Sequence, residues 1–137
     1  MIKDVKTGKE IVVVSQNKVG ILSQIAKTLA ERGINILAIS AQAAGGVGLI
    51  NLVAEDHLRA SELLRKKGFP VQENSVVLAE VEDRPGVLRQ FTQKLAGKKI
   101  DILNIYGSAS AGYGPCLLVL STSDNQKTIV TLRQAAR

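Results

Sequence analysis

The sequence contains an internal repeat, and this repeat limits the architectures open to the chain. Shifting the sequence by 66 residues aligns positions 11–56 with positions 77–122 without a gap, and fourteen of those 46 positions are identical. Unrelated segments of ordinary composition share roughly three to five identities over such a length. Two copies of a long unit indicate duplicated small domains, because a solenoid needs at least three repeats. We therefore predict two domains, residues 1–73 with a leader at 1–10, and residues 74–137.

Composition narrows the classes of function. The 137 residues are 45% hydrophobic, enough to form a packed core. One cysteine and one histidine exclude an internal disulfide, a multi-cysteine metal site and a centre of several imidazoles. Two Phe, two Tyr and no Trp are poor material for stacking nucleobases. The net charge of +6 permits an acidic partner without requiring one. We expect no metal and no cofactor.

The first copy predicts the element order βαββαβ. Short β-branched runs predict strands at 11–14, 34–41, 47–54 and 71–73, with Gly45-Gly46 turning the second strand into the third. Apolar residues at helical spacing predict a helix that ends at Arg32-Gly33, and a second helix runs from about 56 to 67. The first helix is expected to bury five side chains, Val19, Leu22, Ile25, Ala26 and Leu29.

The second copy repeats this order up to its last strand. Strands are expected at 76–81, 100–106 and 116–120, with a helix from Pro85 and another from about 124. The helix from Pro85 is expected to face inward through Leu88, Phe91, Thr92 and Leu95. Position 71 maps onto the last residue, so the closing strand of this copy is missing from its end. Residues 2–5 are a candidate to cover the open sheet edge.

Two turns carry a resemblance to a known family. Residues 17–22 (NKVGIL) and 83–88 (DRPGVL) each join a first strand to a first helix, and residues 33–36 (GINI) lead into the second strand. In this order of elements they resemble the ACT domain family. The resemblance implies an α+β fold of two ferredoxin-like βαββαβ modules, with antiparallel sheets and helices on one face. It further implies allosteric regulation through a small bound ligand, usually an amino acid, near the first turn and at domain or subunit interfaces.

The chemistry of the turns agrees with such a ligand. A helix N-terminus leaves N–H groups unpaired and suits a carboxylate, and a glycine lets a ligand approach the backbone. The family resemblance also implies polar contacts at the start of the second strand. The candidate residues are Asn17, Lys18, Val19, Gly20, Ile21 and Asn35, and in the second copy Asp83, Arg84, Pro85, Gly86, Val87 and Asp101. Ser40 and Gln42 are further candidates for the same groove. The alternative interpretation is that the turn residues only cap or pack the helices.

Other signals favour structural roles. Gly45–Gly48 and Gly112–Gly114 lie between strands, so we interpret them as hairpin turns rather than nucleotide loops. Residues 7–10 lack the pattern of a phosphate loop and are expected to be a solvated leader. His57 is expected to cap a helix or face solvent, and Cys116 to be buried in a strand.

We therefore expect a non-catalytic regulatory protein that binds an amino acid and forms a homodimer or larger homo-oligomer through sheet or helix pairing. One alternative is a ligand-free protein–protein interaction module or a regulatory subunit of an amino-acid-biosynthesis enzyme. A further alternative is nucleic-acid binding. The N-terminal residues do not form the apolar segment of a signal peptide, and the two uncharged stretches, 33–54 and 102–123, contain polar and glycine residues throughout. We expect a cytoplasmic protein without membrane contact.

Overall fold

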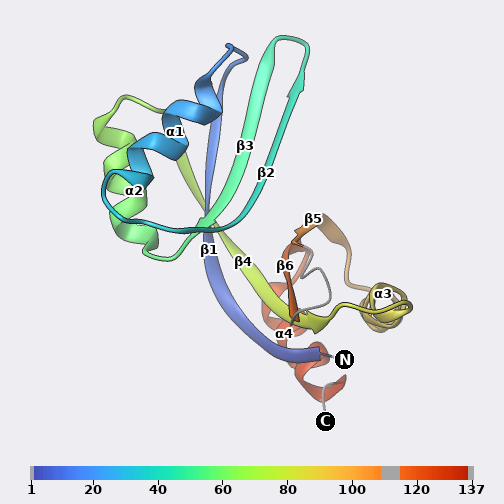
Figure 1. Ribbon diagram of the computed structural model, residues 1–137. Coiled ribbons are helices and arrows are strands. Elements are labelled where there is room, and N and C mark those ends of the chain that lie inside the picture. Colours follow the sequence, from blue (N-terminus) through green and yellow to red (C-terminus); the bar gives the residue numbers. More distant parts are fainter. Residues whose placement is uncertain (1, 109–114, 136–137) are drawn as a thin grey trace. The chain divides into compact units, whose positions relative to one another are not determined.

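The computed structural model describes residues 2–108 and 115–135, which form an α+β fold (Figure 1). Contacts between Cα atoms divide the chain into two compact units. The 9–74 unit is Lys9–Asn74, and the 75–137 unit is Ser75–Arg137 together with Met1–Gly8. The elements are β1 (Ile2–Gln16), α1 (Ile21–Ala30), β2 (Ile36–Ala44), β3 (Val47–Ala54), α2 (His57–Lys66), β4 (Val71–Glu82), α3 (Val87–Gly97), β5 (Ile102–Gly107), β6 (Pro115–Thr122) and α4 (Asn125–Ala135).

The strands form one six-stranded antiparallel sheet in the order β2-β3-β1-β4-β6-β5. Strands β1 and β4 are long, and each runs through both units. The 9–74 unit therefore takes its four strand segments in the order β2-β3-β1-β4, and the 75–137 unit takes them in the order β1-β4-β6-β5. The expected pair of separate sheets is replaced by one sheet, because strands 71–73 and 76–81 of the prediction are a single strand, β4.

The N-terminal residues are not a leader, contrary to our expectation. They form the first half of β1, which belongs to the 75–137 unit. Val5 is 2% exposed in the core of that unit, and its carbonyl accepts a hydrogen bond from Arg133 Nε at 3.1 Å. Gly8 lies so close to Leu78 that an added Cβ would come within 2.5 Å of its Cδ1. The segment proposed to cover the open edge is thus the strand beside β4.

Glu10 also contradicts the expected solvated leader, because it is buried. Its Oε1 atom accepts hydrogen bonds from Asn51 Nδ2 on β3 and from Asn74 Nδ2 on β4, both at 3.3 Å. Buried carboxyl groups are normally hydrogen-bonded, since an unpaired one is costly. Glu10 therefore ties β1 to both of its neighbours within the 9–74 unit.

Each unit has its own core between a sheet face and two helices. In the 9–74 unit, strand residues such as Ile11, Val13 and Leu52 pack against Ile25 and Leu64 of α1 and α2. In the 75–137 unit, the corresponding core joins Val77, Val81 and Leu120 to helices α3 and α4, whose buried residues are Val87, Phe91, Leu95, Ile129 and Leu132. The expected placement of helices on one sheet face is therefore observed in each unit.

Helix α3 begins two residues later than predicted, whereas α1 begins at Ile21, directly after the turn. Gly20 and Gly86 precede them with φ of 89° and 90°, a left-handed conformation that no residue inside an α-helix adopts. Pro85 therefore lies in the turn and not at the first helical position. Val19 is fully exposed in its turn, Leu22 and Leu88 are 40% and 56% exposed, and Ala26 is exposed too. These four predicted inward positions are therefore wrong. Among the other predicted inward positions, Ile25, Leu29, Phe91 and Leu95 are buried.

The repeat also contains a shift that the gapless alignment missed. Ile11 pairs with Leu52, whereas the equivalent residue of the second copy, Val77, pairs with Leu120. The offset is 66 residues for the first strands and 68 for the third, so the second copy has two additional residues before its third strand. Gly45 and Gly46 form the predicted hairpin turn with φ of 58° and 80°. The predicted turn at Gly112–Gly114 lies outside the described residues.

Cys116 is a free, buried cysteine on β6, as predicted. Within the described part of the chain, no helix combines the length and the apolar composition that crossing a membrane requires.

Candidate functional site

The turn between β1 and α1 is fixed by backbone hydrogen bonds. Asn17 N donates to Gly46 O at 2.8 Å, which holds the turn against the tip of the β2–β3 hairpin. Ile21 N donates to Lys18 O at 3.3 Å, and the first i→i−4 bond of the helix runs from Gln24 N to Gly20 O. The N–H groups of Leu22 and Ser23 have no partner within the helix, because they precede its first i→i−4 bond, and Gly20 has no side chain to cap them.

A hollow of about 260 Å³ lies beside this turn. It brings together four of the predicted residues of the first copy and the further candidate Gln42, which lies on β2. Its lining is Asn17, Lys18, Gly20, Ile21, Leu22, Ala41, Gln42, Ala43, Gly48 and Ile50. Amide groups from Asn17 and Gln42 thus share a hollow with the start of α1, whose N-terminal dipole favours a negative group.

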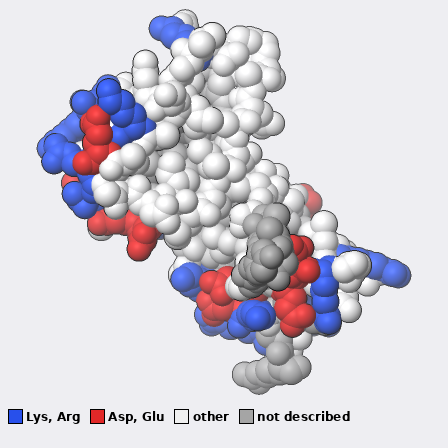
Figure 2. All heavy atoms as spheres, in the orientation of Figure 1, with Lys and Arg blue, Asp and Glu red and all other residues white. Residues whose placement is uncertain are grey.

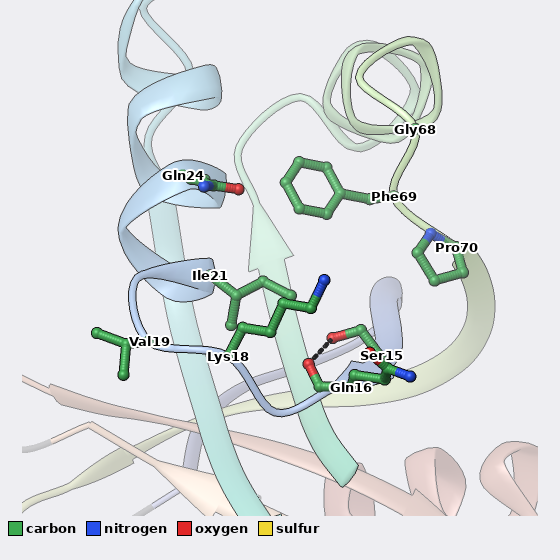
Figure 3. Close-up of a pocket in the computed structure, with 9 residues that line it drawn as sticks. All are labelled: Ser15, Gln16, Lys18, Val19, Ile21, Gln24, Gly68, Phe69 and Pro70. Carbon is green, nitrogen blue, oxygen red and sulfur yellow. Dashed lines mark hydrogen bonds between the residues drawn. The ribbon is translucent and has the colours of Figure 1, made fainter. Parts of the chain in front are cut away.

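A larger pocket of about 420 Å³ lies between α1 and the connection from α2 to β4 (Figure 3). Gln24 on α1 points toward the ring of Phe69, the Lys18 side chain extends into the pocket, and Val19 points away. The lining is Ser15, Gln16, Lys18, Val19, Ile21, Gln24, Gly68, Phe69 and Pro70. Sequence analysis missed this pocket. The one available signal was an aromatic residue between glycine and proline directly after the second helix.

The end of α2 explains how Phe69 is positioned. Gly68 N donates to Arg65 O at 3.0 Å, and Phe69 N donates to Leu64 O at 3.1 Å. With Gly68 at φ 89°, this is the Schellman arrangement, in which a glycine ends the helix and the next residue packs back on it. Phe69 is half-buried and packs against the core of the 9–74 unit, so its ring is a fixed wall of the pocket.

Asn35 lies at the other end of its unit from Asn17. Asn17 bonds to Gly46 before the start of β3, whereas Asn35 O accepts from Glu55 N just after the end of β3. Eight residues of strand separate these points, about 26 Å at 3.3 Å per residue. One small ligand therefore cannot contact both residues of the same unit.

The second copy has a similar turn with different side chains. Arg84 Nε pairs with Glu82 Oε2 at 3.3 Å, and Val87 is 6% exposed in the core. Asp83 precedes α3, and Asp101 precedes β5, where its backbone N–H is bonded to Ser123 Oγ at 2.9 Å. As in the first copy, Asp83 and Asp101 lie near opposite ends of the third strand, here β6, because Glu82 pairs with Pro115 and Ser123 N donates to Asp101 O.

His57 is half-buried and does not cap α2. The cap is Asp56, which accepts from Arg59 N at 3.2 Å. His57 Nε2 instead contacts Glu73 Oε1 on β4 at 2.5 Å, and Arg65 lies 3.4 Å from the other carboxylate oxygen. The hydrogen bond from His57 holds the pKa of the Glu73 carboxyl below its usual 4.5, and Arg65 acts in the same direction. These three residues join the start of β4 to α2.

Charged groups are unevenly distributed over the 9–74 unit. Figure 2 shows Lys and Arg mixed with Asp and Glu over helices α1 and α2, whereas the β2–β3 hairpin carries no charged residue.

Tyr106 is half-buried on β5, and Tyr113 lies outside the described residues. In residues 2–108 and 115–135, no group of three His, Cys, Asp or Glu side chains is placed to hold a metal ion.

Comparison with known families identifies the segment that carries the turn. Residues 9–66 match the ACT domain. This segment contains the turn, both helices of the 9–74 unit and the hollow at Asn17 and Gln42. No curated protein gave a significant match to the sequence.

Solved structures resemble the fold over nearly the whole chain. Protein BT0572 from Bacteroides thetaiotaomicron is 23% identical with a TM-score of 0.88, covering 96% of this chain and 90% of that one. The ligand-free regulatory subunit of aspartate kinase from Thermus thermophilus is 18% identical with a TM-score of 0.69, covering 99% of both chains. The corresponding subunit from Thermus flavus is 17% identical with a TM-score of 0.61, again covering 99% of both. The chain therefore has an ACT-like, ferredoxin-like fold.

Proposed function

We propose that this protein is a non-catalytic regulatory protein that binds a small amino acid at the turn 17–21 of the 9–74 unit. The observation that carries the proposal is the match of residues 9–66 to the ACT domain, together with the hollow that joins Asn17, Gly20 and Gln42. The ligand carboxylate binds at the free N–H groups of α1, and the amide oxygens of Asn17 and Gln42 accept from its ammonium group. Binding then changes the equilibrium of an assembly or a partner protein.

The predicted ligand contacts at Asn35 require a second protein chain in this proposal. Since Asn17 and Asn35 of one unit are too far apart to share a ligand, a homodimer would have to bring Asn35 of one chain to Asn17 of another.

We further propose that the chain is a tandem of two ACT domains divided near residue 73, and that it acts in the cytoplasm. In the second domain, the acidic Asp83 and Asp101 replace the asparagines, and Arg84 is already paired, so we expect weaker binding there.

A thermal-shift screen against the twenty amino acids tests the proposal. A ligand present at a hundred times its dissociation constant stabilises the protein by about 2.7 kcal/mol, which raises the melting temperature by several degrees. Calorimetry should then find one ligand bound tightly per chain. Asn17→Ala removes one amide contact and should weaken binding about tenfold or more. Asn104→Ala, an exposed asparagine on β5, is the matched control and should leave the affinity unchanged. A panel without any shift would contradict amino-acid binding.

A regulatory subunit of an amino-acid-biosynthesis enzyme is the second candidate. It is supported by the similarity to the two aspartate kinase regulatory subunits, which this chain matches over 99% of their length. In that case the partner is an enzyme, and the amino acid bound at the turn is its feedback effector. A ligand-free interaction module would bind such an enzyme equally well with and without any amino acid.

A further inference from the structure

The 420 Å³ pocket is separate from the hollow at the turn, and its size is that of a small-molecule site. Its walls come from three places in the 9–74 unit: the end of β1, the start of α1 and the connection between α2 and β4 (Figure 3). Phe69, Ile21 and Pro70 provide the apolar surface. Phe69 and Ile21 also pack against the core, so this surface is held in place from behind.

The positive charge of the pocket lining favours an anionic ligand. Lys18 is the one charged residue among the nine that line the pocket, and it makes no ion pair with any described residue. Figure 3 shows its side chain extending toward Phe69 and Pro70. An ammonium group at the edge of an apolar wall pairs with a carboxylate whose body lies on that wall. Because the lining has no acidic side chain, a ligand with its own ammonium group would find no charged partner for it here.

In the second copy, the described residues equivalent to the α1 wall of this pocket line a much smaller cavity. Val87 and Gln90 correspond to Ile21 and Gln24, but the cavity that they line has a volume of only about 10 Å³. Its other lining residues are Ile2, Phe91, Lys94 and Ala135. Arg84, which corresponds to Lys18, is already paired with Glu82. At the place of Ile21 and Gln24, the described residues of the second copy thus leave only a small cavity, and the cation at the position of Lys18 is already paired.

We propose that the pocket formed by Lys18, Ile21, Gln24 and Phe69 binds a small organic acid that has a flat apolar body and no ammonium group. Its carboxylate pairs with Lys18 Nζ, its body lies against Phe69 and Ile21, and the Gln24 carboxamide hydrogen-bonds a polar atom beyond the body. Arylacetic acids and 2-oxo acids with large side chains belong to this class. This site goes beyond the proposed amino-acid site, although Lys18 and Ile21 line both cavities.

Amide chemical shifts measured on the full chain with two matched probes test this proposal. Phenylacetate has the aromatic body and the carboxylate, whereas phenethylamine has the same body and a cation. Phenylacetate should cause saturable shifts at the amides of Lys18, Gln24 and Phe69, and phenethylamine should cause none. The absence of saturable shifts with phenylacetate at about 10 mM, or equal binding of both probes, would overturn the proposal.

Three variants separate this pocket from the hollow at the turn. Gln24→Glu places a carboxylate in front of Lys18 and should weaken phenylacetate binding about tenfold or more. Gln42→Ala changes only the other cavity and should leave this affinity within about twofold. Phe69→Leu, which keeps an apolar side chain on the core, should also weaken it. Equal losses in Gln24→Glu and Gln42→Ala would assign the probe to the turn and overturn the proposal. The amino-acid screen is read independently, so either proposal can fail alone.

Discussion

Lys99 occupies a backbone conformation that favours glycine. It ends α3 with φ of 58°, donating from its N–H to Ala96 O at 2.9 Å, while Ile100 N donates to Leu95 O at 3.0 Å. The first copy has the same helix ending, but there the left-handed residue is Gly33, with φ of 69°. The two copies thus share one helix ending, and the second carries the strain of a Cβ in a left-handed position.

Lys99→Gly should therefore stabilise the protein by about 0.5–1 kcal/mol. The substitution removes left-handed strain of about 1–2 kcal/mol and adds an entropic cost of roughly half that size. Lys98→Gly is the matched control, because Lys98 has φ of −96° and gains nothing from glycine, so it should destabilise. Urea unfolding of both variants measures the difference. A loss of stability in both variants would show that glycine costs more than the strain it relieves.

At the scale of single elements, the cluster of His57, Arg65 and Glu73 links α2 to the start of β4. The pKa of Glu73 is lowered in the folded state, chiefly by its hydrogen bond with His57. A lowered folded pKa means that the ionised carboxylate contributes stability above the unfolded value of about 4.5, and that this contribution is lost as the pH falls through the folded pKa. Acid should therefore release the contact between the helix and the strand.

The comparison of Glu73→Gln with the wild type tests this dependence. The wild type should be the more stable protein at about pH 5.5, and its advantage should shrink as the pH falls toward about 3, because the carboxylate is then protonated. Glu62→Gln serves as the control. Glu62 is an exposed acid on α2, so this variant should show little change of stability with pH relative to the wild type. Thermal unfolding across this pH range gives both differences. An advantage that stays constant with pH would mean that the ionised carboxylate contributes nothing.

Most elements could be predicted because their signals are local. The β2–β3 hairpin follows from two adjacent glycines, and α2 follows from Asp56 at its start and basic residues at its end. The start of α3 was misplaced, because Pro85 suits a first helical position although Gly86 after it is left-handed. Turn chemistry and the family resemblance singled out residues 17–21, and all of these except Val19 line one hollow. The Phe69 pocket was missed because its walls come from segments about fifty residues apart, which no local pattern joins.

At the scale of the whole molecule, the closing strand of the second copy is at the other end of the chain. The start of β1 belongs to the 75–137 unit and lies beside β4, at the place of a closing strand. Val5 contributes to the same core as Val77, Phe91 and Leu132, far away in the sequence. Both units therefore depend on β1 and β4, because each of these strands runs through both.

Val5→Ala should consequently destabilise the 75–137 unit, although the substitution lies near the N-terminus. Removing two buried methyl groups costs about 2 kcal/mol, and the melting temperature should fall by roughly 5–10 °C. Lys6→Ala, its exposed neighbour on β1, is the control and should change little. Hydrogen exchange should locate the loss of protection in the core strands and helices of residues 75–135.

Deleting residues 2–8 should expose the edge of β4 and cause association, since an unpaired edge pairs with other chains. An unchanged monomeric melt of the deletion variant would mean that the N-terminal strand does not complete this unit.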